Sequence, residues 1–173
     1  FPILLAALLI IFIEDGFPVL FKQKRTGWDG RRFNIFKLRT LKKKNFDKTI
    51  QVQPGDKRLL FFGKFLRRFS IDELPQIYNV LKGEMSIVGP RPHMTEHSKK
   101  YSNIIKNFLT RHKCSPGITG WAQIHGYRGA TPDDELMKKR LDYDIWYLKN
   151  WSIALDFKIM FRTIYAILKY KVD

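Results

Sequence analysis

Asp72 and Glu73 are adjacent carboxylates in the part of the chain that is richest in reactive side chains. Two arginines, Arg67 and Arg68, precede the pair, and Pro75 follows it. Neighbouring cations keep a carboxylate ionised, and an ionised carboxylate can attack an electrophile. A phosphoryl group suits this basic setting, because arginine, lysine or Mg²⁺ can stabilise the charge that develops during attack. The segment therefore predicts phosphoryl chemistry at the carboxylate pair.

A structural explanation of the same residues stays open. Ser70 and Glu73 have the spacing of a capping box, in which a serine caps the start of a helix and a glutamate caps back. Asp72 would then be a first-turn residue that complements the helix dipole. Pro75 counts mildly against this, since proline sits best at the first helical position. Both interpretations place the carboxylates at or near the N-terminus of a helix.

Other motifs that carry chemistry are missing from the sequence. It contains no Walker loop and no GxGxxG. His93 and His97 are four residues apart, but no third zinc ligand stands near them, so we interpret both as surface residues. Cys114 is the single cysteine, which excludes an internal disulfide and is typical of a packing residue.

The basic residues are concentrated in one part of the chain. The 173 residues include 32 Lys and Arg against 16 Asp and Glu, and residues 22–68 alone hold 16 basic and 3 acidic side chains. Such a positive field attracts polyanions: nucleic acid, anionic lipid headgroups or phosphorylated small molecules. A basic module that binds nucleic acid or membranes without catalysis is therefore the alternative to an enzyme. Aromatic residues do not interleave with the basic ones and no nucleic-acid-binding motif occurs, so we expect no nucleic acid partner.

The hydrophobic pattern predicts one α+β domain. Residues 19–23 and 32–38 read as two strands joined by a glycine-rich turn, which together make a basic β-hairpin. Short helices at 59–69 and 75–82 flank the carboxylates, and a tight Gly-Pro-Arg-Pro corner lies within 87–92. Further predicted elements are loops at 42–54 and 115–131 and helices at 94–109, 133–150 and 152–170.

Both ends of the chain indicate contact with a membrane. Residues 1–13 carry no polar side chain, but as a helix they would extend only about 20 Å, against about 30 Å for the hydrocarbon core. We therefore expect residues 1–16 to be the end of a re-entrant membrane helix, bent at Phe1-Pro2, with a buried core helix as the alternative. The helix at 152–170 fits a membrane interface and, equally, an amphipathic helix that covers the core.

Four stretches of the chain resemble one protein family. Residues 70–92 (SIDELPQIYNVLKGEMSIVGPRP) look like the signature of the bacterial sugar transferases, the monotopic polyprenyl-phosphate phosphoglycosyl transferases. Residues 17–40 resemble the hairpin that precedes this signature, and residues 116–131 and 142–159 resemble the C-terminal part of longer members. The likeness covers nearly the whole chain in order and is greatest to undecaprenyl-phosphate glucose phosphotransferases. It implies that residues 17–173 are a catalytic phosphoglycosyl transferase domain.

The resemblance also implies a two-step reaction. Asp72 matches the family nucleophile, which would attack the β-phosphate of a UDP-sugar, release UMP and hold the phospho-sugar covalently. Polyprenyl phosphate would then take the hexose 1-phosphate, expected to be glucose 1-phosphate, in the first step of surface polysaccharide assembly. Glu73 matches the partner of the nucleophile, and Asp72 and Glu73 are the expected Mg²⁺ ligands.

Further site residues follow from the same resemblance. Arg67 matches a catalytic position, and the expected substrate-binding residues are Lys37, Arg39, Pro90, Arg91, Pro92 and Asp144. The implied partners are a UDP-sugar, polyprenyl phosphate and membrane lipids, with a homo-oligomer as an open alternative to a monomer. The implied location is the bacterial inner membrane, with the catalytic domain on its cytoplasmic face.

Overall fold

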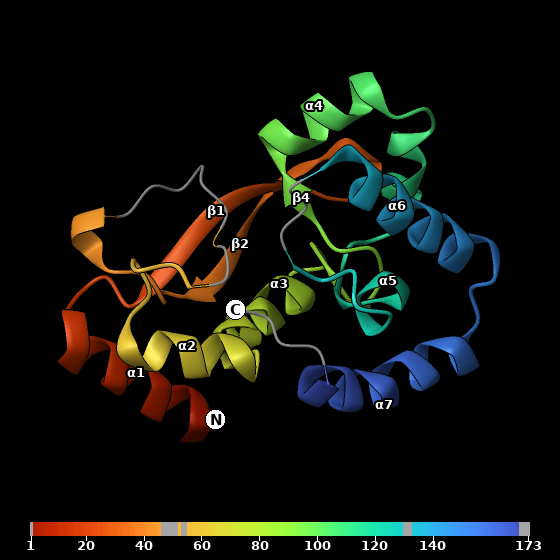
Figure 1. The fold of residues 1–173 in the computed structure, drawn as a ribbon. Helices are drawn as coiled ribbons and strands as arrows, with labels where there is room; N and C mark the ends of the chain where they lie inside the picture. Colours follow the sequence, from red (N-terminus) through yellow and green to blue (C-terminus); the bar gives the residue numbers. More distant parts are fainter. Residues whose placement is uncertain (1, 46–51, 53–54, 130–132, 170–173) are drawn as a thin grey trace.

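The structure, a computed structural model, describes residues 2–45, 52, 55–129 and 133–169. These residues form one α+β unit, as the sequence predicts, and in it two small sheets are surrounded by helices (Figure 1). Four predictions fall partly outside the described residues. They are most of the loop at 42–54, the Phe1 side of the bend, residues 130–131 of the loop at 115–131, and residue 170 of the helix at 152–170.

A basic β-hairpin forms the main sheet. β1 (Leu20–Thr26) and β2 (Arg32–Leu38) pair antiparallel over their whole length. β2 has the predicted bounds, whereas β1 continues past the predicted end at Gln23, because its far end also pairs with β4 (His93–Met94). The sheet order β2-β1-β4 therefore brings the segment that follows residue 92 beside the hairpin.

A second sheet supports the Gly-Pro-Arg-Pro corner. β3 (Ser86–Val88) and β5 (Gly117–Thr119) pair in parallel, and neither strand was predicted from the sequence. The two backbones touch, since a Cβ on either Gly89 or Gly117 would collide with backbone atoms of the facing segment. Glycine is therefore required at both positions. The Gly117 amide donates to the Pro90 carbonyl over 2.9 Å, which fixes the corner against β5.

The N-terminal helix shares a core with the helix that precedes the carboxylates. α1 (Pro2–Asp15) packs against α2 (Phe61–Arg68) and against residues of the hairpin. The buried members of this cluster are Ala7, Ile11, Leu38, Leu60 and Leu66. α1 thus belongs to the same folded unit as the residues that follow it, and it ends at Asp15, within the predicted segment 1–16. Among the described residues, no helix is both long and apolar enough to cross a membrane.

The predicted helix at 94–109 is shorter than expected. α4 (Thr95–Ile104) ends where Ile105 takes an extended conformation, and a 3-10 helix, η4 (Phe108–Lys113), follows. The Phe108 side chain is 1% exposed and packs against α6 (Asp134–Lys149). Burial of this ring therefore outweighs continuation of the helix, since fully burying a phenylalanine contributes about 1.5–3 kcal/mol.

The helices not yet named are α3 (Ile77–Leu81), α5 (Trp121–Ile124), α7 (Ile153–Lys169) and the 3-10 turns η1 (Trp28–Gly30), η2 (Lys43–Asn45) and η3 (Ile71–Gln76). All of these except α7 are short. The predicted helix at 75–82 is thus divided between η3 and α3, and the predicted loop at 115–131 contains β5 and α5.

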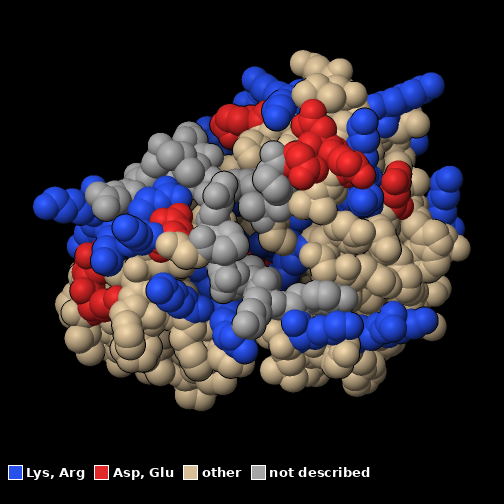
Figure 2. Space-filling view, in the orientation of Figure 1, with Lys and Arg blue, Asp and Glu red and all other residues tan. Residues whose placement is uncertain are grey.

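One edge of the molecule is apolar. α1, α2 and α7 lie along the lower edge of Figure 1, and the same edge of Figure 2 is mostly free of charged residues, with Lys and Arg gathered above it. The exposed apolar side chains on these helices include Ile3, Leu5, Leu9, Phe61, Phe65, Phe157, Phe161, Ile164 and Leu168. The inner face of α7 buries Leu155 and Ile159 in the core. α7 therefore covers the core with one face and exposes an apolar surface with the other.

Candidate active site

The two carboxylates lie in η3, which begins after a residue with left-handed backbone. The backbone of Ser70 has a φ of 60°. In the turn that follows, Asp72 and Glu73 are buried, and each is 5% exposed. The capping box does not form, because the Ser70 hydroxyl makes no capping hydrogen bond and the Glu73 side chain binds elsewhere. Only the backbone closes the turn, where the Glu73 amide donates to the Ser70 carbonyl over 3.1 Å. The predicted capping box is therefore wrong, although both carboxylates do lie in the first turn of η3.

Glu73 binds three cationic side chains from three parts of the chain. Lys37 Nζ, on β2, lies 2.7 Å from Glu73 Oε1. Arg91, in the corner after β3, donates to both carboxylate oxygens, over 2.5 Å to Oε1 and 3.2 Å to Oε2. Arg128, which follows α5, donates from Nη2 to Oε2 over 2.9 Å. Both oxygens of Glu73 are thus occupied, and the carboxylate holds three cations around one point.

These neighbours fix the charge of Glu73. Burial alone would raise the pKa of Glu73, but Arg91, Lys37 and Arg128 together lower the pKa well below its usual range. Burial also lowers the pKa of Lys37 to about 8, against the attraction of Glu73. Arg25, on β1, is a further cation near Glu73 and donates from Nη1 to the Pro92 carbonyl over 3.2 Å. At neutral pH the cluster therefore carries more positive than negative charge.

Asp72 differs from Glu73 because it has no hydrogen-bond or ion-pair partner among the described residues. Burial raises the pKa of Asp72 and Glu73 adds to the rise, while Lys37, Arg67 and Arg128 oppose it. A carboxylate that is desolvated and not held by hydrogen bonds keeps its lone pairs available for attack. The geometry therefore divides the pair, with Glu73 organising the cations and Asp72 free to react.

Arg67 lies on the Asp72 side of the site. It is in the last turn of α2 and its charge acts on Asp72. Its Nη1 is 3.5 Å from Thr40 Oγ1, and its Nε is buried without a hydrogen-bond partner in the part of the chain that the structure describes. The Nε–H group of Arg67 is therefore available to donate a hydrogen bond to a phosphate oxygen.

Arg39 does not join the carboxylates, although the resemblance placed it with the substrate. Its side chain is buried and binds the Asp15 carboxylate. It also donates to the carbonyls of Gly16, Pro18 and Leu41, so that all three of its nitrogens are engaged. Arg39 thus ties the end of α1 to the end of β2.

Asp144 lies one layer behind the site rather than in it. It is 2% exposed and forms an ion pair of 2.7 Å with Arg111 Nη2. The same nitrogen donates to the Arg91 carbonyl over 2.7 Å. Arg140, whose charge also acts on Asp144, donates from Nη2 to the Gly129 carbonyl over 2.7 Å. Asp144 thus pairs with Arg111 and its pKa responds to the charge of Arg140, and each of these arginines binds the main chain at or next to an arginine of the site.

Pro90 and Pro92 contribute their carbonyls to the framework of the site. Pro90 accepts from the Gly117 amide, and Pro92 accepts from Arg25. Both prolines are buried, whereas Arg91 between them is partly exposed. The corner is therefore fixed on both sides of Arg91, and this aims its guanidinium at Glu73.

Comparison with known proteins identifies the family of this fold and site. The family described as bacterial sugar transferase matches residues 1–170. The chain belongs to the bacterial sugar transferase family. The family resemblance found in the sequence is thereby confirmed, and the non-catalytic, nucleic-acid-binding alternative gains no support.

Relatives with assigned names point in the same direction. A UDP-glucose:undecaprenyl-phosphate glucose-1-phosphate transferase of Klebsiella pneumoniae is 47% identical over 165 residues, covering 95% of this chain and 36% of the relative. A protein of the same name from Escherichia coli (strain K12) is 46% identical over 165 residues, with the same coverage. A UDP-N-acetylgalactosamine-undecaprenyl-phosphate N-acetylgalactosaminephosphotransferase of Aeromonas hydrophila is 42% identical over 169 residues, covering 96% of this chain and 39% of the relative. The chain thus spans little more than a third of the length of these sugar transferases.

Two cations of this bacterial sugar transferase site were not predicted as site residues. Arg128 stands between two glycines in the GYRG stretch, and this isolated charge in a glycine-rich loop was the available signal. Arg25 gave no signal, since it is one of many basic residues in the hairpin. His93 was interpreted as a surface residue, which is wrong because it is 5% exposed in β4. Burial and nearby arginines, Arg111 foremost, hold its pKa well below the usual range.

The carboxylates fit a metal ion only in part. Among the described residues, no group of three or more His, Cys, Asp or Glu side chains gathers that could hold a metal. Both oxygens of Glu73 are taken by cations, which leaves Asp72 as the available carboxylate. Mg²⁺ at phosphate-transfer sites is usually held by one or two carboxylates together with substrate phosphates. The side chains therefore fit a Mg²⁺ held by Asp72 and by phosphate oxygens.

Proposed function

We propose that this domain transfers a hexose 1-phosphate from a UDP-sugar to polyprenyl phosphate, with glucose as the expected sugar. The observation that carries the proposal is the contrast between Asp72, which has no partner among the described residues, and Glu73, which three cations hold. A free carboxylate beside a surplus of fixed positive charge is suited to attack a diphosphate. The names of the relatives, which include UDP-glucose and undecaprenyl phosphate, agree with these substrates.

In the first step, an oxygen of Asp72 attacks the β-phosphorus of the UDP-sugar. A bond forms between that oxygen and phosphorus, and the bond from phosphorus to the bridging oxygen breaks. The electron pair stays on the bridging oxygen, which leaves as part of UMP. The sugar phosphate is then held on Asp72 as an acyl phosphate.

The cations lower the energy of this step. Lys37, Arg91 and Arg128 are held by Glu73 before substrate arrives, so they need little reorganisation to face the phosphate charge. Arg67 offers its buried Nε on the Asp72 side. When bound, Mg²⁺ would be held by Asp72 and would supply positive charge that stabilises the phosphate oxygens.

In the second step, a phosphate oxygen of polyprenyl phosphate attacks the phosphorus that Asp72 carries. The bond between phosphorus and the Asp72 oxygen breaks, which frees the carboxylate and gives a polyprenyl diphosphate sugar. This acceptor is a lipid, so the site must work at a membrane surface. The apolar edge formed by α1, α2 and α7 supports such a location, which we propose to be the cytoplasmic face of the bacterial inner membrane.

The proposal is tested by the nucleotide that is released. Purified protein with Mg²⁺, UDP-glucose and undecaprenyl phosphate should release UMP and not UDP. Asp72→Asn should abolish release, whereas Asp142→Asn, the same change at an exposed carboxylate, should retain it. Turnover by Asp72→Asn at the rate of the unchanged protein would refute the nucleophile.

The identity of the sugar requires a separate experiment. Relatives named for glucose and for N-acetylgalactosamine are similarly close to this chain, at 46% and 42% identity. We expect UDP-glucose to give the highest kcat/KM in a panel of UDP-sugars. A higher value for UDP-N-acetylgalactosamine would replace glucose but leave the reaction unchanged.

A further inference from the structure

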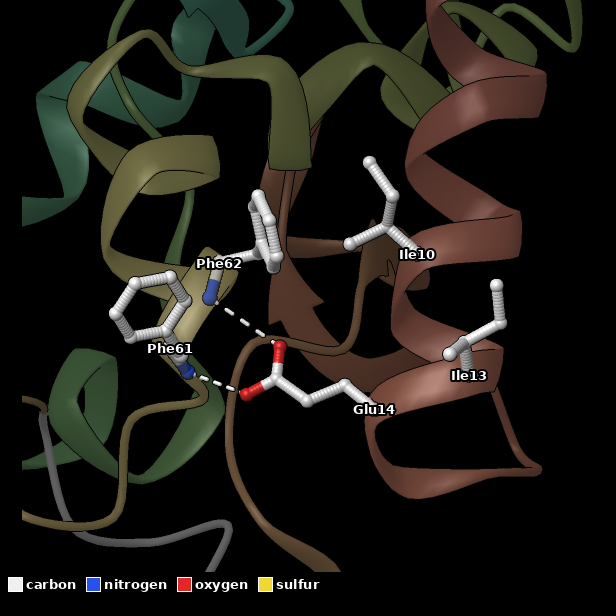
Figure 3. Close-up of a pocket in the computed structure, with 5 residues that line it drawn as sticks. All are labelled: Ile10, Ile13, Glu14, Phe61 and Phe62. Atoms are coloured by element: carbon white, nitrogen blue, oxygen red, sulfur yellow. Dashed lines mark hydrogen bonds between the residues drawn. The ribbon is translucent and has the colours of Figure 1, made fainter.

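An apolar slot of about 340 Å³ lies between the end of α1 and the start of α2. Its walls are Ile10 and Ile13 on α1 and Phe61 and Phe62 on α2. Figure 3 shows the Phe62 ring between the two helices, facing the isoleucines. The rim is exposed, since Ile13 is 82% and Phe61 80% accessible. The slot therefore opens on the apolar edge of the molecule.

Among the described residues that line the slot, Glu14 is the one with a charge, and its carboxylate already has hydrogen-bond partners. Its carboxylate accepts hydrogen bonds from the backbone amides of Phe61 and Phe62, so it caps the N-terminus of α2 (Figure 3). Within the part of the chain that the structure describes, no lysine or arginine lines the slot. An anionic headgroup would thus meet a carboxylate and no cation, which excludes a phosphate from the slot and leaves an apolar chain as its suitable occupant.

A row of phenylalanine rings connects the slot with the carboxylates. Phe61, Phe65 and Phe69 follow one another at four-residue spacing on α2 and just after it, and they are 80%, 53% and 38% exposed. The rings of Phe65 and Phe69 lie 4.7 Å apart. Eight helical residues extend about 12 Å, so the slot and Asp72 lie at opposite ends of α2.

We propose that the slot and this phenylalanine row bind the isoprenoid tail of the acceptor. The inference rests on the proposed function, because it assumes that the phosphate of the acceptor reaches Asp72. The argument is the order of charged and apolar side chains along α2. Arg67 and Asp72 lie at the end of α2, where the phosphate of the acceptor must bind. The exposed phenylalanine rings follow along the helix, and the apolar slot lies at its start, where the isoprenoid tail continues. A polyprenyl phosphate has the same order of charge and apolar chain.

The experiment compares two acceptors that differ only in tail length, undecaprenyl phosphate and geranyl phosphate. Geranyl phosphate carries two isoprene units, and we expect its tail to end before the slot while its phosphate is at Asp72. Phe62→Ala removes one wall, and Ile13→Trp fills the mouth from an exposed position that tolerates a larger side chain. We expect either variant to lower kcat/KM for undecaprenyl phosphate about fivefold to tenfold, the size of a partly lost apolar contact, and to leave geranyl phosphate unchanged.

Matched variants on α7 separate tail binding from general membrane contact. Phe157→Ala and Ile164→Trp make the same changes at side chains that are 54% and 66% exposed. They should leave the ratio between the two acceptors unchanged. An equal loss with both acceptors, or an equal loss from the α7 variants, would overturn the proposal.

A photoreactive label decides the occupant without relying on catalysis. A prenyl phosphate with benzophenone at the end of its tail should label peptides that contain Ile13 or Phe62, and excess undecaprenyl phosphate should suppress the labelling. Equal labelling by a phospholipid with the same benzophenone would assign the slot to membrane acyl chains and refute the proposal. If no acceptor gives UMP but the prenyl label is specific, the proposed function fails and the slot assignment stands.

Discussion

Arg128 Nη2 lies 2.9 Å from Glu73 Oε2, although 55 residues separate the two in the sequence. Arg128 stands in the loop between α5 and α6, whereas Lys37 and Arg91 come from the hairpin and the Pro-Arg-Pro corner. The segment after residue 120 therefore contributes directly to the site. The adjacent Gly129 carbonyl accepts from Arg140, which holds this loop on α6.

Replacing Arg128 by alanine should lower kcat/KM for the UDP-sugar about tenfold to a hundredfold. The change removes one of the three cations that Glu73 positions, and charge-assisted donors at a transferring phosphate contribute on this scale. UMP release measured against UDP-sugar concentration gives the value, and Arg128→Lys should recover part of it. Arg31→Ala, at an exposed site in the hairpin turn, is the control. Equal activity of Arg128→Ala and the control would show that Arg128 has no part in catalysis.

The pH dependence of kcat/KM should be bell-shaped, and two groups determine its limbs. Asp72 must be ionised to attack, and burial raises its pKa above the ordinary 3.8, so the acid limb should lie above that value. Lys37 must be protonated to balance phosphate charge, and its pKa of about 8 places the alkaline limb near pH 8. Lys37→Arg should move the alkaline limb to higher pH, because arginine stays protonated. An alkaline limb that does not move would assign it to another group.

Asp72→Asn should make the protein more stable at neutral pH while it abolishes turnover. A raised pKa in the folded state means that ionised Asp72 is favoured more in the unfolded chain, so its cost appears as pH rises through the folded pKa. Asparagine carries no charge, so this cost is absent from the variant. Thermal unfolding of both proteins should show the difference at pH 7 and its disappearance below about pH 3.8. A variant that melts lower than the unchanged protein at pH 7 would contradict the assignment.

Sequence patterns predicted the parts of the fold that local chemistry determines. β2 has the predicted bounds because a run of β-favouring residues, interrupted in its alternation only at Ile35-Phe36, pairs with β1 over its whole length. The helices at α6 and α7 were predicted because helical spacing recurs over several turns, and Asp133 caps α6 through a bond to the Leu136 amide. The carboxylate pair was found because Asp72 and Glu73 are neighbours in sequence.

Residues whose role depends on distant partners could not be placed in this way. β3 and β5 are three residues long and exist because Gly89 and Gly117 allow close approach, which no local propensity indicates. Asp144 was found from family resemblance alone, and its place behind the site depends on Arg111 in η4, a turn that the sequence did not predict. The break in the helix predicted at 94–109 is decided by burial of Phe108, which is a tertiary effect.

Glu14→Ala should lower the free energy of unfolding by about 1 kcal/mol, the usual contribution of a helix cap. Glu14 accepts from the first two amides of α2, and the N-cap residue, Leu60, makes no capping hydrogen bond with its side chain. Because α2 leads directly to Arg67 and the carboxylates, kcat should fall together with stability. Urea unfolding gives the free energy, and Glu135→Ala, at a side chain that is 79% exposed, should leave the unfolding midpoint nearly unchanged. A loss no larger than that of Glu135→Ala would mean that solvent caps α2 equally well.

Asp144→Asn should destabilise the protein strongly, by about 3–5 kcal/mol, because it leaves Arg111 charged and buried without its partner. The double variant Asp144→Leu with Arg111→Met should recover most of this stability, since apolar pairs often replace buried ion pairs without loss. Its activity should nevertheless stay low, because the Arg91 carbonyl then lacks the donor that fixes its position. Urea unfolding measures the first quantity and UMP release the second. Recovery of both together would mean that Asp144 and Arg111 only support the fold, whereas recovery of stability alone identifies them as residues that position Arg91 toward Glu73.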